Sequence, residues 1–214
     1  MKTHDKQLKS TRATLLECAE KLFLTHGFEG VSIRQITDAA GANVAAVNYH
    51  FSGKMNLYRE ILAQRLDEIT RDKLELLKKL DEQQPAADLE QILDKFVRSY
   101  FDFLLASPDS DRLLQIIYRE MGPDAIASDL VATRLAIPIH QAFRVTILHA
   151  RPDLDENHAS YCVSSIIGQV LHFIRAREIL KDIRSPDQHQ TFIEDAVHHI
   201  TQFSLRGIGS KTNA

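Results

Sequence analysis

The chain has 214 residues, of which 44% are hydrophobic and 26% are charged, and its formal net charge is −3. These values are ordinary for a globular protein and argue against a chain that binds polyanions through its overall charge. No apolar run reaches the roughly 20 residues of a membrane-spanning helix, and the first residues are too polar for a signal peptide. The two cysteines, Cys18 and Cys162, lack metal or redox spacing, so we expect reduced thiols in a cytoplasmic protein that does not contact a membrane.

The first 80 residues are predicted to form four helices, of which the middle two are very short. Each helix has a signal at one of its ends, such as a capping box, a glycine after the last turn or an asparagine cap. The expected spans are about 7–26 before Gly27, 33–40 between Ser32 and Gly41, 44–51 after Asn43, and 53–80 after Ser52.

The rest of the chain also follows a helical pattern, with expected spans of about 87–107, 110–121, 124–149, 155–182 and 185–206. Pro138 lies inside the third of these spans, and Ser185 with Pro186 marks the start of the last. The predicted fold is therefore all-α with about nine helices. A helix-turn-helix unit of three helices (1–52) precedes a helical bundle (53–214), which opens with the long connecting helix 53–80.

The N-terminal unit is predicted to be a helix-turn-helix because two short helices, joined by a tight glycine turn, follow a longer bracing helix. The second short helix, 44–51, would enter the major groove, which is about 12 Å wide. Its leading residues are small, so its backbone can come close to the bases. These residues are Val44, Ala45 and Ala46.

Polar residues around this helix are the candidate DNA contacts. Asn43 and Asn48 are expected to hydrogen-bond a base or a phosphate, because amides pair well with adenine. Phosphate contacts position a protein on the duplex, and the candidates for them are Ser32, Arg34, Tyr49, His50 and Lys54. One alternative is that 44–51 is simply a small buried helix. A second is that the chain is an all-α interaction module whose N-terminal unit binds another protein and no DNA.

The segment GFEGVSIRQITDAAGANVAAVNYHFSGKMNLYREIL resembles the N-terminal signature of the TetR family of bacterial transcriptional regulators, and the match covers about residues 10–63. The chain departs from that signature at four positions that bear on which operator is read: Thr37, Ala42, Asn43 and Asn48. Carried over by position, the resemblance implies DNA contacts at Ser32, Arg34, Ala45, Ala46, Asn48, Tyr49, His50 and Lys54.

Two later segments, IIYREMGPDAIASDLVATRLAIPIHQAF and SSIIGQVLHFIRAREIL, are similar to the CecR-like subgroup. This family pairs the N-terminal reader with a C-terminal domain for dimerisation and ligand binding, so the resemblance implies a homodimer. Ser164 and Gly168 are small and one turn apart, which favours close packing of the last two helices in a four-helix interface. The alternative is that these helices only pack in the core of their own chain.

A ligand pocket is expected where polar side chains occur within the apolar C-terminal helices. The candidate polar residues are Arg119, His140, Arg144, Gln169, His172 and Arg175, and the candidate apolar walls are Tyr100, Phe103, Tyr118 and Met121. For each polar residue the alternative is a core group satisfied by a neighbour, such as an ion pair between Arg119 and Glu120.

Enzymatic and metal-binding motifs are missing from the sequence. Glu194, His198 and His199 lack a complementary set of ligands, so no metal site, no catalytic residue and no cofactor is expected. The sequence predicts a ligand-responsive regulator and not an enzyme. Its partners would be a double-stranded DNA operator, a second copy of itself and a small-molecule effector. We expect a repressor that binds a pseudo-palindromic operator as a homodimer and is released by the effector.

Overall fold

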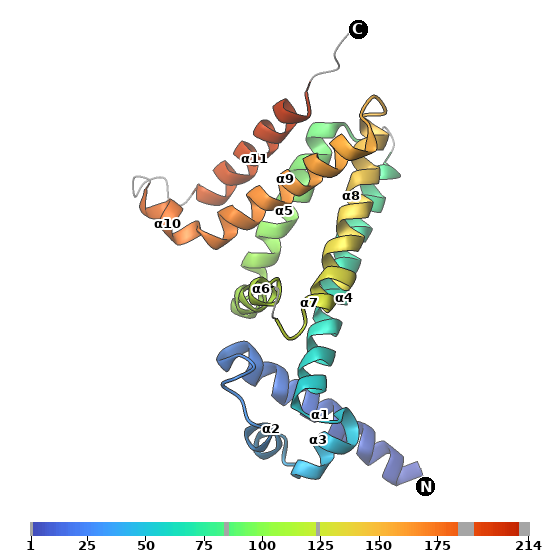
Figure 1. Cartoon of the computed structure of the whole chain (residues 1–214), viewed down its shortest axis with the longest axis vertical. Coiled ribbons are helices and arrows are strands. Elements are labelled where there is room, and N and C mark those ends of the chain that lie inside the picture. Colours follow the sequence, from blue (N-terminus) through green and yellow to red (C-terminus); the bar gives the residue numbers. More distant parts are fainter. Residues whose placement is uncertain (1, 84–85, 123–124, 184–190, 210–214) are drawn as a thin grey trace. The chain divides into compact units, whose positions relative to one another are not determined.

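The structure is a computed structural model that describes residues 2–83, 86–122, 125–183 and 191–209. Across these residues the chain is helical without a β-strand, and nine helices have eight or more residues (Figure 1). The predicted all-α fold is thereby confirmed. Contacts group the chain into two compact units. Unit 1 comprises Met1–Ile69 and Ser107–Leu135, and unit 2 comprises Thr70–Ala106 and Ala136–Ala214.

These compact units do not coincide with the domains expected to divide at residue 52, and that domain boundary stays a prediction. Helix α4 (Lys54–Asp81) runs without interruption from unit 1 into unit 2. Residues Ser107–Leu135 belong to unit 1 because helix α6 (Pro108–Glu120) packs against helix α1 (Lys2–His26). This pairing joins segments far apart in the chain, and no local pattern signals it.

Local capping defines the two short helices, α2 (Ile33–Ala40) and α3 (Val44–Phe51), as the sequence predicted. Ser32 and Gln35 form a reciprocal capping box at the start of α2. Gly41 ends α2 with a left-handed φ of 60°, a conformation that glycine adopts without steric cost. Asn43 then caps α3 by accepting a 2.9 Å hydrogen bond from the Ala46 backbone N–H.

The prediction that Ser52 begins α4 is wrong. Ser52 ends α3 in the left-handed region, with φ 58°, and its N–H donates to the Asn48 carbonyl at 2.9 Å. Gly53 follows with φ 118°, and α4 starts at Lys54. Two successive residues with positive φ therefore turn the chain, and the serine is a C-cap rather than an N-cap.

The core of unit 1 forms where apolar stripes of its helices meet. α1 contributes three fully or nearly fully buried side chains, and α2 and α3 face them. These side chains are Leu15, Ala19, Phe23, Ile36, Val47 and Phe51. The small helices are thus held by tertiary packing, which short helices need for stability in water.

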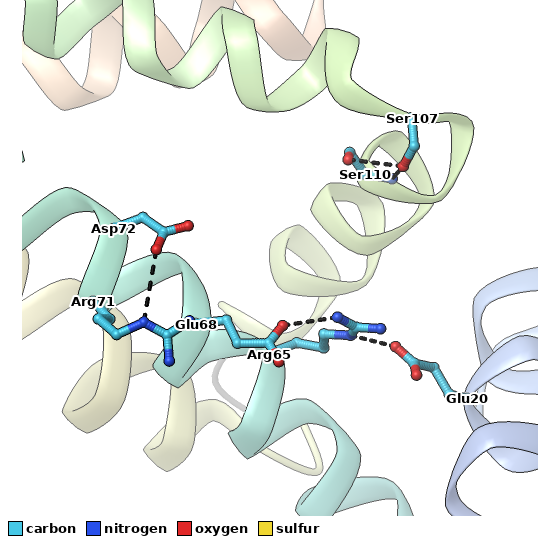
Figure 2. Close-up of polar contacts among 7 residues, drawn as sticks. All are labelled: Glu20, Arg65, Glu68, Arg71, Asp72, Ser107 and Ser110. Atoms are coloured by element: carbon cyan, nitrogen blue, oxygen red, sulfur yellow. Dashed lines mark hydrogen bonds and ion pairs between the residues drawn. The ribbon is translucent and has the colours of Figure 1, made fainter.

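The prolines in the first turns of α6 and α8 (Ile137–Ala150) act differently. Ser107 caps α6 through the Ser110 N–H at 3.1 Å, with Pro108 in the first helical position (Figure 2). By contrast, the continuous helix predicted over 124–149 is wrong. The short α7 (Ser128–Leu130) runs into a π-helical turn at Val131–Ala136 before α8 begins. Pro138 has no N–H and its ring clashes with the carbonyl four residues earlier, which accounts for the widened turn before it.

Unit 2 is a bundle in which α11 (Phe192–Ile208) packs on α5 (Leu89–Ala106) and on α9 (Glu156–Arg175), and α8 packs on α9 (Figure 1). Phe96 and Phe143 stack at its centre with their rings 3.6 Å apart. None of the helices in the described ranges has the length and apolar composition to cross a membrane.

Helix α9 is shorter than predicted, because the chain leaves helical geometry at Ala176 and the separate α10 (Arg177–Asp182) follows. Neither glycine nor proline marks this break, so the expected single helix over 155–182 is wrong for a reason that the local sequence does not show. The start predicted at Ser185 lies outside the described residues.

Candidate nucleic-acid interface

Helix α3 has two distinct faces. Val47 and Phe51, four residues apart, are buried against the core of unit 1. Val44, Ala45, Asn48 and Tyr49 are exposed, and the Tyr49 side chain is 73% accessible. Because these four positions are spaced i, i+1, i+4 and i+5, they lie on one side of the helix. The described structure therefore excludes the alternative in which 44–51 is a helix buried on all sides.

The exposed face of α3 carries small side chains near its N-terminus and polar side chains toward its C-terminus. Ala45 is exposed and Ala46 half-buried, so nothing larger than a methyl group projects between Val44 and Asn48 on this side. Tyr49 and the half-buried His50 follow, with their rings in contact at 4.9 Å. Such a helix can approach a base edge with its first turn while its last turn meets the DNA backbone.

Asn43 and Asn48 differ in what they can offer to DNA. The Oδ1 atom of Asn43 already caps α3, which leaves its amide N–H₂ group as the donor toward a ligand. Asn48 is exposed on the same face as Ala45. Adenine needs one donor and one acceptor. Asn48, whose carbonyl and amide both face solvent, is therefore better suited than Asn43 to pair with it.

Ser32 and Arg34 lie at the start of α2, the first helix of the α2–α3 pair. Both are exposed, and the Ser32 hydroxyl is held within the capping box by Gln35. The Arg34 side chain is 87% accessible and forms only a 3.9 Å ion pair with Asp38. Exposed pairs of this kind contribute little, so a phosphate could replace Asp38 at small cost.

Lys54 has a role that the sequence did not predict. Its Nζ atom donates to the carbonyls of Phe28 and Val31, both at 2.9 Å, and lies 4.0 Å from the centre of the Phe28 ring. The ammonium therefore fixes the segment between α1 and α2 on the first turn of α4. Its expected phosphate contact stays a prediction, now limited to the remaining N–H donor.

Arginines outside the predicted site brace α3 and α4. Arg12 of α1 lies over the Phe51 ring, 5.0 Å from its centre, and pairs with Glu60. Figure 2 shows Arg65 of α4 between Glu20 of α1 and Glu68, which accepts at 2.7 Å. The ion pairs of Arg12 with Glu60 and of Arg65 with Glu20 join positions 48 and 45 residues apart, so sequence spacing gave no signal for them.

The comparisons with known proteins agree with this geometry. The family model described as bacterial regulatory proteins of the tetR family matches residues 15–61. The model of the C-terminal domain of the HTH-type transcriptional dual regulator CecR matches residues 89–208, more than half of the chain. The chain belongs to the TetR family of bacterial transcriptional regulators. Members of this family are DNA-binding transcriptional regulators.

Curated relatives of this TetR-family chain include repressors, an activator and a dual regulator. It is 25% identical to the dual regulator CecR of Shigella flexneri, covering 80% of this chain and 79% of that one. It is 26% identical to the repressor NicS of Pseudomonas putida, covering 75% of each chain. The chain spans 58% of YttP of Bacillus subtilis and 44% of the activator FasR of Mycolicibacterium smegmatis, each with 27% identity over the matched part.

Solved structures share the fold at low sequence identity. FadR of Bacillus subtilis, solved in complex with stearoyl-CoA, superposes with a TM-score of 0.66 at 10% identity, covering 91% of this chain and 98% of that one. A TetR-family regulator from Bordetella parapertussis superposes with a TM-score of 0.59 at 17% identity, covering 91% and 94%. These likenesses establish the TetR-like fold.

The residues expected to line a ligand pocket in this TetR-family protein fall into both units. Tyr118, Arg119 and Met121 lie in unit 1, whereas the other seven lie in unit 2. Arg119 Nε is 3.7 Å from the buried carboxylate of Glu120, the ion pair that the sequence left open as an alternative. Met121 is exposed.

Within unit 2, several of the expected polar residues have protein partners. His140 Nε2 is 3.2 Å from both the Ser160 carbonyl and the Ser164 hydroxyl, and Arg144 donates to Glu156 at 2.5 Å. His172 and Arg175 are exposed on α9, whereas Tyr100 and Phe103 are half-buried on α5.

Gln169 lies elsewhere in unit 2, at a cavity of about 340 Å³ between α9 and α11. Its Nε2 atom donates to the Ser204 hydroxyl at 3.5 Å. The cavity is also lined by His158, Tyr161, Cys162, Ser165, Ile166, Phe203, Ser204, Gly207 and Ile208. It therefore includes one of the ten residues expected in a ligand pocket.

In the described part of the chain, no three His, Cys, Asp or Glu residues gather as metal ligands. Glu194 of α11 is engaged by Arg98 of α5, which donates to its carboxylate at 2.8 Å.

Proposed function

We propose that this TetR-family protein is a homodimeric repressor that binds a pseudo-palindromic operator and is released by a small-molecule effector. The observation that carries the proposal is the exposed face of α3, where Val44, Ala45, Asn48 and Tyr49 lie together above a buried Val47 and Phe51. Such a regulator would act in the cytoplasm, where the operator is.

Operator symmetry follows from a dimer. Two α3 helices related by a two-fold axis meet successive major grooves only when the half-sites lie one or more DNA turns apart. The outer faces of α9 and α11 supply a surface for such a dimer. Tyr161 and Phe203 are exposed there, and Gly168 allows close approach of a second helix. Exposed aromatic side chains beside small residues are typical of helical interfaces.

Effector release is supported by the organisation of the chain. Helix α4 contributes residues to both units, so it is the element through which a ligand bound in unit 2 would act on the DNA-binding unit. The relative NicS is a repressor, and FadR, which shares the fold, was solved with stearoyl-CoA bound. A few kcal/mol of differential ligand affinity between two dimer geometries is enough for release.

Footprinting of the purified protein on the DNA upstream of its own gene tests this proposal. We expect a salt-sensitive protected region with two-fold symmetry. A variant in which Tyr49 is replaced by Phe should weaken binding by a similar factor on every operator sequence, whereas Asn48→Ala should change the preferred base. Absence of protection at low salt on that DNA and on a genomic fragment library would refute DNA binding.

A further inference from the structure

Unit 2 contains a buried lysine that forms no ion pair among the described residues. Lys73 of α4 is only 5% accessible. Its Nζ atom donates to the Ser99 hydroxyl at 2.6 Å and lies 4.0 Å from the centre of the Tyr100 ring. Among the described residues no carboxylate lies within 4.0 Å of the Lys73 ammonium, the distance limit of an ion pair. Arg98 and Arg144, by contrast, each pair with a glutamate. The single hydroxyl and the aromatic face leave at least one N–H of the ammonium without an acceptor.

Such an arrangement is costly for a protein that has no use for it. Buried charges are normally paired, because removing a charge from water costs several kcal/mol. The nearest acidic groups are not placed to compensate. Asp72 is exposed and 3.8 Å from Arg71 (Figure 2), and Asp102 is exposed on α5. Burial accordingly lowers the pKa of Lys73 to about 7, although both aspartates oppose this shift.

The surroundings of the amine are aromatic on one side. The Ser99 hydroxyl donates its proton to the Phe96 carbonyl at 2.6 Å, so it acts as an acceptor toward Lys73. Phe96 contacts Tyr100 edge-on at 5.4 Å and stacks on Phe143. One turn beyond, Phe103 is half-buried. Lys73 thus lies at the polar end of an apolar wall formed by α5 and α8.

Tyr100 supplies a second unused donor. Burial raises the pKa of its hydroxyl, and this hydroxyl has no hydrogen-bond partner among the described residues. The residue is nevertheless half-buried rather than sealed, so part of it borders accessible space. At least one N–H of the ammonium and the neighbouring phenolic O–H are therefore without an acceptor among the described residues.

We propose that Lys73 and Tyr100 bind the acidic group of the effector, and that the effector is an apolar monocarboxylate whose hydrocarbon part packs on Tyr100 and Phe103. This inference rests on the proposed effector-controlled function and assigns the chemistry of its ligand. A carboxylate accepts from both donors and supplies the missing counter-ion, which a neutral ligand does not. A single lysine suits a single charge, whereas a polyphosphate needs several cations.

Calorimetric titration of the full-length protein in the absence of DNA tests the proposal, with decanoate as probe and 1-decanol as its neutral counterpart. The wild type should bind decanoate at least about tenfold more tightly than 1-decanol, a ratio that corresponds to one charge-assisted contact. Lys73→Met keeps most of the side-chain volume and should abolish this preference while leaving 1-decanol binding unchanged. The matched control is Lys95→Met, which removes an exposed lysine from α5 and should change neither affinity.

Two further variants keep the test decisive if Lys73→Met unfolds. Lys73→Arg retains the charge and should retain the preference for decanoate, and Tyr100→Phe should reduce it without affecting 1-decanol. A wild type that binds both probes equally, or variants that lose both equally, would overturn the proposal. A protein that prefers decanoate but shows no footprint would refute the repressor and leave the carboxylate site standing. A footprint without a preference for decanoate would refute the carboxylate site and leave the repressor standing.

Discussion

The hydroxyl of Tyr58 donates a 2.7 Å hydrogen bond to the carboxylate of Glu120, which is 2% accessible. The other oxygen of this carboxylate accepts from the Ala127 backbone N–H at 2.9 Å. Burial, with the bond to Glu120, raises the pKa of the Tyr58 hydroxyl above its usual range. Because the Tyr58 ring also packs against Phe28, 5.1 Å away, this bond joins α4 and α6 to the segment that leads into α2.

Replacing Tyr58 by Phe should therefore destabilise unit 1. The ring would be retained, but the buried Glu120 carboxylate would lose a donor, which costs about 1–3 kcal/mol. Urea denaturation followed by circular dichroism measures the change. Tyr49→Phe is the matched control, because that residue is exposed on α3 and its substitution should leave the unfolding midpoint unchanged. Equal midpoints for both variants would show that the hydrogen bond contributes nothing.

Lys54→Met should reduce both stability and DNA binding. Loss of the hydrogen bonds to Phe28 and Val31 would release the segment before α2, at a cost of about 1 kcal/mol or more. Operator affinity should fall by a similar factor on every sequence, because the helix pair loses its position but not its base-reading side chains. Denaturation and gel-shift titrations on the operator and its single-base variants measure the two effects. A changed base preference would contradict this assignment.

Ala45→Leu should abolish operator binding without destabilising the fold. The position is exposed, so the larger side chain meets no core residue, but it would hold α3 away from the base edges. We expect a loss of at least about 100-fold in affinity, corresponding to roughly 3 kcal/mol of lost contacts. Ala106→Leu, at the exposed end of α5, controls for the added apolar surface. Tight binding by the α3 variant would mean that another face of the unit reads DNA.

The helix-turn-helix was predictable because its signals are local. The capping box at Ser32, the turn at Gly41 and the cap at Asn43 each depend on residues within four positions. Ser52 was misjudged because serine before a helix usually caps it, and its left-handed φ depends on how α3 and α4 meet. The partners of Lys54 and Lys73 were not predictable. Each lysine bonds groups 23 to 26 residues away, which packing alone brings near.

Phe203→Asp should convert the proposed dimer into a monomer. Phe203 is exposed on α11 beside the cavity that α9 and α11 enclose, so a carboxylate at this position would be buried without a partner in a two-fold interface. Sedimentation velocity at micromolar concentration measures the change, and operator affinity should fall with it because half-sites bind weakly alone. Ile179→Asp, on the exposed surface of α10, should stay dimeric. Dissociation of both variants would place the interface elsewhere.

The stability of the protein should rise between pH 7 and pH 9 because of Lys73. Its pKa is about 7 in the folded chain, whereas the unfolded chain has the usual value of 10.5. Between these values the unfolded chain binds a proton that the folded chain does not, so the free energy of unfolding increases with pH. Below pH 7 both states are protonated and this contribution is constant. We expect a rise of about 2 kcal/mol from pH 7 to pH 9, measured by urea denaturation. Lys73→Met should lack this rise, whereas Lys95→Met should show it in full. The same slope in all three proteins would mean that Lys73 has an ordinary pKa and a counter-ion in solution.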